Sequence, residues 1–301
     1  MQADMNLLSE ARLQPVVVPA QAAAAQCMQR GWRARLALAY GATARGTRLL
    51  KREHSGPLTV QKALYPEGQA VCHTLVLHPP SGIVGGDRLE FDVDVRDRAH
   101  ALITMPGATR WYKSAGEEAV QKLDVHVAAS GVLEWLPPET IIFNCANARM
   151  QTRIALEPGA RYTGWEILCL GRTASGETFA DGLLRQHTAI TVGSALVWDE
   201  RLRLAGDAPL LRSAVGLSSA PVSATLLAAG VKVPAELLAR CREISAQGTA
   251  RAGVSAMDAV FVARYVGTSS EQAREYFVAL WRVLRPLMAG REAVTPRIWN
   301  T

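Results

Sequence analysis

Apolar and charged residues alternate along much of the first two thirds of the chain. The segment 89–96 reads Leu-Glu-Phe-Asp-Val-Asp-Val-Arg, and the segments 123–127 and 201–204 repeat the alternation over shorter lengths. An extended chain points successive side chains to opposite faces, so each segment is predicted to be a strand with one buried face. The segment 72–77 is apolar on both faces and is typical of a strand in the interior of a sheet.

Turn sequences rich in glycine and proline interrupt these segments at short intervals. Pro79-Pro80, Gly85-Gly86 and Pro106-Gly107 are examples. Many short strands between regularly spaced turns are typical of an all-β domain. We therefore expect β-structure over about residues 32–205.

The pattern changes in the last third of the chain. Prolines followed by leucines at helical spacing favour helices within 218–248, and 256–266 has the composition of one more strand. A longer amphipathic helix is predicted beyond them, and Pro286 is expected to end it. The sequence thus predicts about two α-helices in this third. The apolar face of the longer helix would consist of Ala273, Tyr276, Phe277, Leu280, Trp281 and Leu284.

The composition is that of a folded domain without a clustered charge. Apolar residues make up 49% of the 301 residues and charged residues 20%, which excludes wholesale disorder. The formal net charge is +6, and most basic residues are arginines spread from Arg12 to Arg297. A nucleic-acid-binding surface would cluster these charges, so we expect no nucleic-acid partner.

Five cysteines lie tens of residues apart, and no pair has the C-x-x-C spacing. This usage disfavours a disulfide framework or a zinc ribbon and indicates reduced thiols in the cytoplasm. The N-terminus lacks the pattern of a signal peptide, and no run of about 18 apolar residues predicts a membrane span. Residues 1–31 lack periodicity and are interpreted as a flexible N-terminal arm, followed by a single β-rich domain at 32–301.

The local sequence disfavours three kinds of site. The glycine-rich segment 82–87 lacks the Lys-Ser/Thr of a phosphate-binding loop and leads into a predicted strand, so it is interpreted as a turn. His73 and His78 are an odd number of residues apart, which places them on opposite faces of a strand and disfavours a tight metal site. No G-x-S-x-G motif indicates a nucleophilic serine, and we expect no catalytic residue.

Five carboxylates lie beside turns or tryptophans within the β-rich segment: Asp87, Glu134, Glu139, Glu166 and Glu177. Such oxygen ligands hold a metal ion weakly, which suits transfer better than storage. The same residue types are also common as turn caps and as partners of arginine, and both interpretations stay open. Glu134 and Glu139 flank Trp135, a pattern that a carbohydrate-active enzyme with two catalytic carboxylates would share.

Several longer strings follow one another in a distinctive order. They are 56–62 (GPLTVQK), 77–87 (LHPPSGIVGGD), 104–112 (TMPGATRWY), 133–143 (LEWLPPETIIF), 164–166 (GWE), 176–179 (GETF) and 296–301 (PRIWNT). With these strings the chain resembles the urease accessory protein UreD family, also called UreH, and the resemblance covers about Trp32 to Thr301. From that resemblance glycine is expected where Ser81 stands, threonine at Met105 and glutamine at Pro138.

The resemblance implies an all-β dominated fold that is β-helix-like or built of stacked sheets of many short strands. It implies a non-enzymatic urease maturation factor that binds UreF, recruits the GTPase UreG and acts on the urease apoprotein subunits. Nickel would pass transiently through this scaffold to the urease active site, with no cofactor bound tightly and GTP used only by UreG. A homodimer within the accessory complex is compatible with this role, and no membrane is involved.

For this role the candidate nickel-transit residues are Asp87, Glu134, Glu139 and Glu166, with His78 and Glu177 as weaker candidates. The alternative function is a carbohydrate-active enzyme on a β-rich scaffold. Such an enzyme would turn over a saccharide without partners and would lose that activity on the substitution Glu134→Gln.

Overall fold

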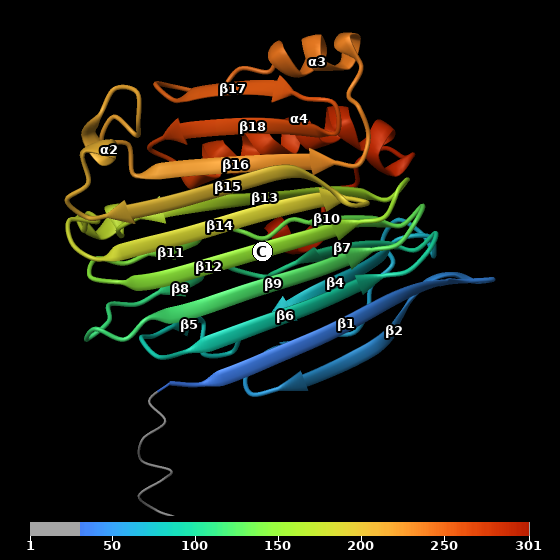
Figure 1. Ribbon diagram of the computed structural model, residues 1–301, viewed down its shortest axis with the longest axis horizontal. Helices are drawn as coiled ribbons and strands as arrows, with labels where there is room; N and C mark the ends of the chain where they lie inside the picture. Colours follow the sequence, from blue (N-terminus) through green and yellow to red (C-terminus); the bar gives the residue numbers. More distant parts are fainter. Residues whose placement is uncertain (1–30, 301) are drawn as a thin grey trace, which may run out of the picture. The chain divides into compact units, whose positions relative to one another are not determined.

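Two β-sheets stacked on each other form the body of the protein (Figure 1). The structure is a computed structural model that describes residues 31–300. Sheet 1 has seven strands and sheet 2 has eleven, so the predicted β-dominated fold class is confirmed. The predicted N-terminal arm lies, apart from Gly31, outside the described residues.

Sheet 1 is mostly parallel. Its inner strands run side by side in one direction, and only the two end strands pair antiparallel with their neighbours. In spatial order the strands are β15 (Ala195–Ala205), β14 (Leu183–Val192), β12 (Asn147–Leu156), β9 (Ala119–Val127), β6 (Arg88–Val95), β1 (Arg33–Thr43) and β2 (Gly46–Ser55).

Sheet 2 combines a parallel half with an antiparallel half. Its main path runs through β17 (Arg251–Ala256), β18 (Val260–Gly267), β16 (Val222–Ala229), β13 (Arg161–Leu170), β10 (Val132–Trp135), β7 (His100–Thr104), β4 (Cys72–Leu77) and β3 (Thr59–Val60). Three short strands lie beside this path: β5 (Gly82–Ile83), β8 (Thr109–Trp111) and β11 (Thr140–Ile142). Strand β5 pairs with β8, β8 with β11, and β11 with β13.

The chain winds through both sheets as a coil. From β6 in sheet 1 it crosses to β7 in sheet 2 and returns by β8 to β9, and the next turn of the coil runs through β9, β10 and β11 to β12. Successive turns stack in register, so that Phe91 pairs with Leu123 and Val93 with Val125. The alternating apolar residues therefore form continuous rows that face sheet 2, which gives the fold its solenoid-like character.

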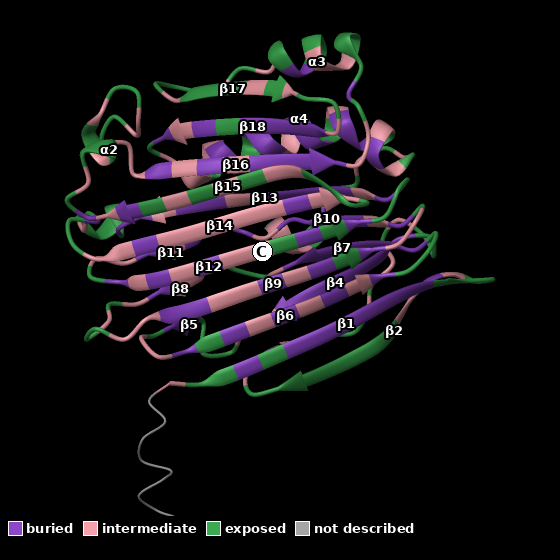
Figure 2. Cartoon of the chain, viewed as in Figure 1, coloured by how far each residue is buried: buried purple, intermediate pink, exposed green. Residues whose placement is uncertain are grey.

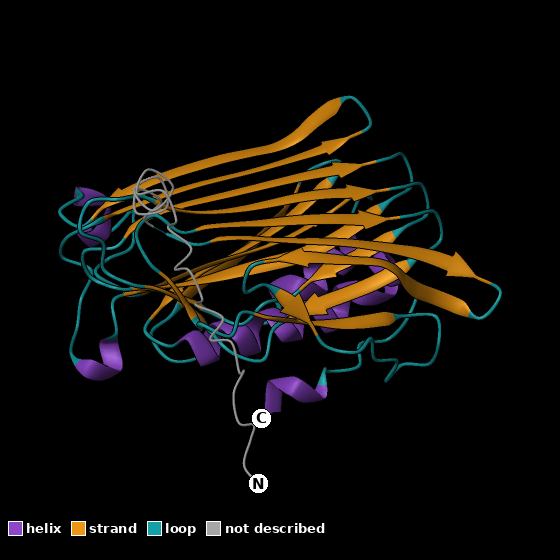
Figure 3. Cartoon of the chain, turned by 90° about the horizontal axis from the view of Figure 1, so that it is seen from below, coloured by secondary structure: helices purple, strands orange, loops and turns teal. Residues whose placement is uncertain are grey.

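Three α-helices and two 3-10 helices complete the described residues. Helix α4 (Ser270–Ala289) covers the outer face of sheet 2 (Figure 3). The Ser269 hydroxyl accepts a hydrogen bond from the backbone N–H of Gln272 and caps the helix. The other helices are α2 (Pro209–Arg212), α3 (Ala235–Arg242), η1 (Thr173–Ser175) and η2 (Arg297–Asn300). None of the helices within residues 31–300 is long and apolar enough to cross a bilayer.

Pro286 lies inside α4, so the prediction that it ends the helix is wrong. The helix continues to Ala289 and ends at Gly290, whose φ of 66° is the left-handed conformation common after a helix C-terminus. Arg285, which precedes the proline, is held by two buried carboxylates from sheet 2 and the loop before β4. These ion pairs anchor the last turns of the helix to the rest of the protein.

Two apolar cores lie on opposite sides of sheet 2. The first is between the sheets and contains inward-facing residues such as Phe91 and Leu123. The second is between sheet 2 and α4, where the rings of Trp165 and Phe277 have centroids 6.2 Å apart. The outer face of sheet 1 is instead a mixture of exposed and half-buried positions (Figure 2).

The predicted elements of the first two thirds are confirmed, and those of the last third are confirmed in part. Segments 72–77 and 89–96 correspond to β4 and β6, and α3 lies within the helical segment 218–248. The prediction of a helix is wrong for residues 222–229 of that segment. They form β16, because pairing with β13 and β18 and burial on both faces outweigh the local leucine spacing. The strand expected at 256–266 begins at Val260.

The structure gives a physical reason for the glycine expected at Ser81. This residue has a φ of 54°, in the left-handed region that glycine adopts without steric cost. Ser81 adopts the same conformation, and its hydroxyl accepts a hydrogen bond of 3.3 Å from Arg110.

Candidate functional site

A polar stretch interrupts the apolar space between the two sheets. Glu166 of β13, Gln186 of β14, Glu200 of β15 and Thr225 of β16 meet there and line two adjoining cavities of about 50 and about 280 Å³. We call these cavities the inner and outer compartments of the interlayer passage, and the four shared residues its junction. The strand alternation explains the arrangement, because each of these side chains occupies an inward position of its strand.

Glu166 is the most unusual acid of the junction. Burial, and to a smaller extent the charge of Glu200, raise the pKa of Glu166 to about 8. The Gln186 amide donates a hydrogen bond to Oε2 of Glu166, and no cationic side chain of the described residues forms an ion pair with it. The carboxyl group is therefore mostly protonated at neutral pH, and it can exchange that proton for a metal ion.

Glu200 differs from Glu166 because it has a cationic partner. The Nη1 atom of Arg264, from β18, lies 2.6 Å from Oε1 of Glu200 and 2.9 Å from Oγ1 of Thr225. The guanidinium carbon of Arg264 also lies 5.7 Å from the centroid of the Trp198 ring. Arg264 thus lines the outer compartment and contacts two of the four junction residues.

No tight metal site accompanies this arrangement. Within residues 31–300, no three His, Cys, Asp or Glu side chains are grouped closely enough to hold a metal ion. The junction offers two carboxylates and one amide oxygen, a set of hard oxygen ligands that holds a divalent cation weakly. Such a site can bind and release an ion, but it does not store one.

A second polar cluster lies on the opposite face of sheet 2, beneath α4. We call it the Arg285 cluster. Both of its carboxylates accept bonds from the Arg285 guanidinium, and each also contacts a histidine: His73 at 2.7 Å from Glu67, and His100 at 2.6 Å from Glu134. The cluster consists of Glu67, His73, His100, Glu134, Trp281 and Arg285.

Glu134 has every donor that a buried carboxylate needs. The Trp281 indole donates to Oε2 at 2.6 Å, and Arg285 donates to both oxygens at 2.9–3.2 Å. Burial alone would raise the pKa of Glu134, but the hydrogen bond and charge of His100 and the charge of Arg285 lower it to about 2. The residue is an ionised anchor for α4, and it lines neither compartment of the interlayer passage.

Asp87, another predicted transit residue, caps a turn. Its Oδ1 accepts a hydrogen bond of 2.7 Å from the Trp32 backbone, and its Oδ2 accepts one of 2.9 Å from the Val84 backbone. The carboxylate therefore fixes the start of β6 against the segment before β1. Of the two interpretations that the sequence left open for these carboxylates, the contacts of Asp87 are those of a turn cap.

The remaining predicted residues lie apart from one another. Glu177 accepts a bond of 2.7 Å from Arg172 and another from the Asn144 backbone. His78 lines a separate cavity of about 190 Å³, and burial lowers its pKa. Glu139 is half-buried next to Cys169, and together with burial its charge helps to raise the pKa of that thiol to about 11. Of the six predicted residues, only Glu166 lines the passage.

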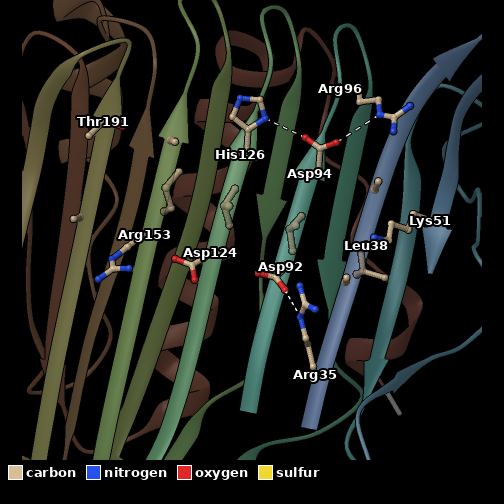
Figure 4. Close-up of a pocket in the computed structure, with 17 residues that line it drawn as sticks. Arg35, Leu38, Lys51, Asp92, Asp94, Arg96, Asp124, His126, Arg153 and Thr191 are labelled. Atoms are coloured by element: carbon tan, nitrogen blue, oxygen red, sulfur yellow. Dashed lines mark hydrogen bonds and ion pairs between the residues drawn. The ribbon is translucent and has the colours of Figure 1, made fainter. Parts of the chain in front are cut away.

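The largest concavity is a groove of about 780 Å³ on the outer face of sheet 1 (Figure 4). Its carboxylates are mostly paired: Asp92 with Arg35 at 2.7 Å, and Asp94 with both His126 and Arg96. Because opposite charges alternate along its floor, the groove carries no concentrated charge that would select a cation or an anion.

Sequence reasoning missed most of the junction and most of the Arg285 cluster. A signal for Glu200 existed, since the alternation in 201–204 extended by one residue places Glu200 on the face of Leu202 and Leu204. For Arg285 the signal was its position four residues after Trp281, on the buried face of the helix. Neither pattern reveals the partner residues, which are distant in the sequence.

Comparisons with known proteins agree on one family. A family model described as UreD urease accessory protein matches residues 32–300. The urease accessory protein UreD of Methylobacillus flagellatus is 46% identical over 270 residues, covering 90% of this chain and 95% of that protein. The corresponding proteins of Dechloromonas aromatica (90% and 95% covered) and of a Janthinobacterium species (89% and 91%) are each 48% identical, over 273 and 271 residues.

Proposed function

Because this chain belongs to the urease accessory protein UreD family, we propose that it serves urease maturation as a non-enzymatic scaffold through which nickel reaches the apoprotein. The general role, assistance to urease, comes with the family. The route of the metal, the partners and the absence of catalysis are our proposal.

The interlayer passage is the main support for nickel transfer. Glu166, Glu200 and Gln186 of its junction line both compartments, so that their side-chain oxygens are available as ligands. Nickel binds nitrogen and sulfur ligands more tightly than oxygen, so oxygen ligands favour release to an acceptor. Glu166 also lacks a cationic partner among the described residues, and a divalent ion that displaced its proton would supply the positive charge that the ionised carboxylate needs.

In this proposal the chain acts in the cytoplasm and in association with UreF and the GTPase UreG. GTP is hydrolysed on UreG, and the chain itself binds no cofactor tightly. The relatives are named as urease accessory proteins, which supports a role in assisting an enzyme rather than in catalysis. The wide polar face of sheet 1, which no helix of the described residues covers, leaves room for such partners.

A carbohydrate-active enzyme is less well supported. Its two catalytic carboxylates would have to flank a cleft that is open to a sugar. Glu134, one of the two acids in question, is 1% exposed, and both of its oxygens are occupied by Arg285. It cannot protonate a glycosidic oxygen from that position.

The test is the nickel content of urease co-expressed with the accessory proteins at limiting nickel. Glu166→Gln keeps the shape of the side chain and removes its ability to ionise, and we expect it to lower nickel content severalfold while the accessory complex still assembles. Glu53→Gln, at an exposed position of β2, is the matched control and should load urease fully. Full loading with Glu166→Gln as well would refute the proposed route.

A further inference from the structure

The position of Arg264 bears on how an ion would enter the interlayer passage. The two compartments have in common only the junction, so an ion in the outer compartment must contact junction residues to reach the inner one. Arg264 lies in the outer compartment and bonds to Glu200 and Thr225, which are half of the junction. A guanidinium bonded to Glu200 engages the carboxylate that an entering cation would contact, and it repels that cation.

The ion pair between Arg264 and Glu200 is short but not sealed from solvent. The side chain of Arg264 is 47% exposed and that of Glu200 is 31% exposed. Ion pairs at such exposure contribute little to stability, so they can be broken at small cost. The contact is therefore better suited to exchange than the buried pair of Arg285 with Glu134, whose side chains are 0% and 2% exposed.

The Arg264 guanidinium has a second contact beside Glu200, the ring of Trp198. The Trp198 ring is already within cation–π range of Arg264, at 5.7 Å. The indole N–H of Trp198 is buried and has no hydrogen-bond partner among the described residues, so no such bond ties the ring to another position. If Arg264 left Glu200, the ring face would still stabilise its charge.

We propose that Arg264 is an exchangeable counter-ion that closes the outer compartment: a divalent cation takes its place on Glu200, and the guanidinium moves onto Trp198. This inference rests on the proposed function, since it assigns regulation to the same passage. The exchange leaves Glu200 paired before and after the ion arrives, so the carboxylate is never left uncompensated. A monovalent cation, with half the charge, competes poorly with the guanidinium.

The experiment measures uptake of Ni²⁺ alone by the purified protein, in complex with its accessory partners, against a chromophoric chelator in stopped flow. Arg264→Gln removes the positive charge, and we expect Ni²⁺ to associate roughly five- to tenfold faster than with the unmodified protein. Arg264→Lys keeps the charge and should stay near the original rate. Arg35→Gln, which breaks a similar ion pair in the outer groove, is the matched control and should change nothing.

The outcomes separate this inference from the proposed function. An unchanged rate for Arg264→Gln, in protein with an unaltered melting temperature, overturns the role of Arg264 whatever the other variants do. If Glu166→Gln and Glu200→Gln lose Ni²⁺ binding in that case, the passage still stands as the route. If both bind Ni²⁺ normally, the route itself fails. Equal acceleration by Arg35→Gln would show a general charge effect and would also overturn the role of Arg264.

Discussion

Glu134, which is buried, and Glu166, which is half-buried, lie on neighbouring strands of sheet 2 in opposite electrostatic surroundings. Glu134 points toward α4 and receives Arg285, His100 and Trp281, and its pKa falls to about 2. Glu166 points toward sheet 1 and meets an amide and a second carboxylate, and its pKa rises to about 8. Sequence context treats the two alike, since each lies next to a tryptophan.

The difference shows that burial does not by itself decide what a carboxylate does. A buried acid with cationic donors on all sides is ionised and structural, and removing a partner leaves an uncompensated charge. A half-buried acid without a cation keeps its proton to a higher pH and can exchange that proton for a metal ion. The direction in which a strand points its side chain therefore separates an anchor from a candidate ligand.

The largest expected effect comes from removing the cation of the Arg285 cluster. Arg285→Met leaves Glu67 and Glu134 as buried, partly unpaired carboxylates, and we expect it to lower the free energy of unfolding by about 3–5 kcal/mol. Urea denaturation at neutral pH measures the change. Arg282→Met, on the exposed side of the same helix, should cost less than about 1 kcal/mol. Equal losses for both variants would contradict the anchoring role.

A smaller effect, of opposite sign, is expected for Glu166. A carboxyl whose pKa is raised from 4.5 to about 8 on folding costs stability as the pH rises through this range, because the folded state resists its ionisation. The substitution Glu166→Gln removes that loss of stability, because glutamine does not ionise. We expect it to be about 1–3 kcal/mol more stable than the unmodified protein at pH 8 and nearly equal to it at pH 4, below the ordinary pKa of 4.5. Unfolding curves at both pH values measure this difference, and a gap that is constant with pH would refute the assignment.

The smallest effect is expected for Asp87, whose partners are neutral backbone donors. Asp87→Asn keeps one acceptor oxygen for the N–H groups of Trp32 and Val84, and it should cost about 1 kcal/mol of unfolding free energy. Urease nickel content should stay normal. Asp97→Asn, at an exposed position, serves as the control. Reduced nickel content at unchanged stability would support the predicted role of Asp87 in transit over its role as a cap.

Local pattern was sufficient to predict the strands of the first two thirds of the chain, but not β16 or the partners within the Arg285 cluster. The alternation in 89–96 and the doubly apolar 72–77 depend only on which face of a strand is buried, and this information is local. Arg285 contacts residues 218 and 151 positions earlier in the chain, and such pairings depend on how the coil closes. The helix expected over 222–229 failed for the same reason, since pairing with β13 and β18 is not local.

Of the four junction residues, the sequence analysis selected only Glu166 as a candidate. Glu166 was found because it lies beside Trp165 in the β-rich segment, whereas Gln186 and Thr225 carry no distinctive local signal. Glu134 was chosen by the same criterion as Glu166, but its side chain lies on the opposite face of sheet 2 and therefore has different partners. Assigning that face requires knowing that α4 returns to cover one side of sheet 2.

A coil of stacked strands needs a way to stop, because its last strand offers unpaired backbone groups to any other chain. One of the two edge strands of sheet 1 is β2, and its residues 51–54 are Lys, Arg, Glu and His, all exposed. Another strand docking there would have to desolvate four ionisable side chains in a row. The exposed charged residues of β2 thus oppose pairing of this edge with a strand of another chain.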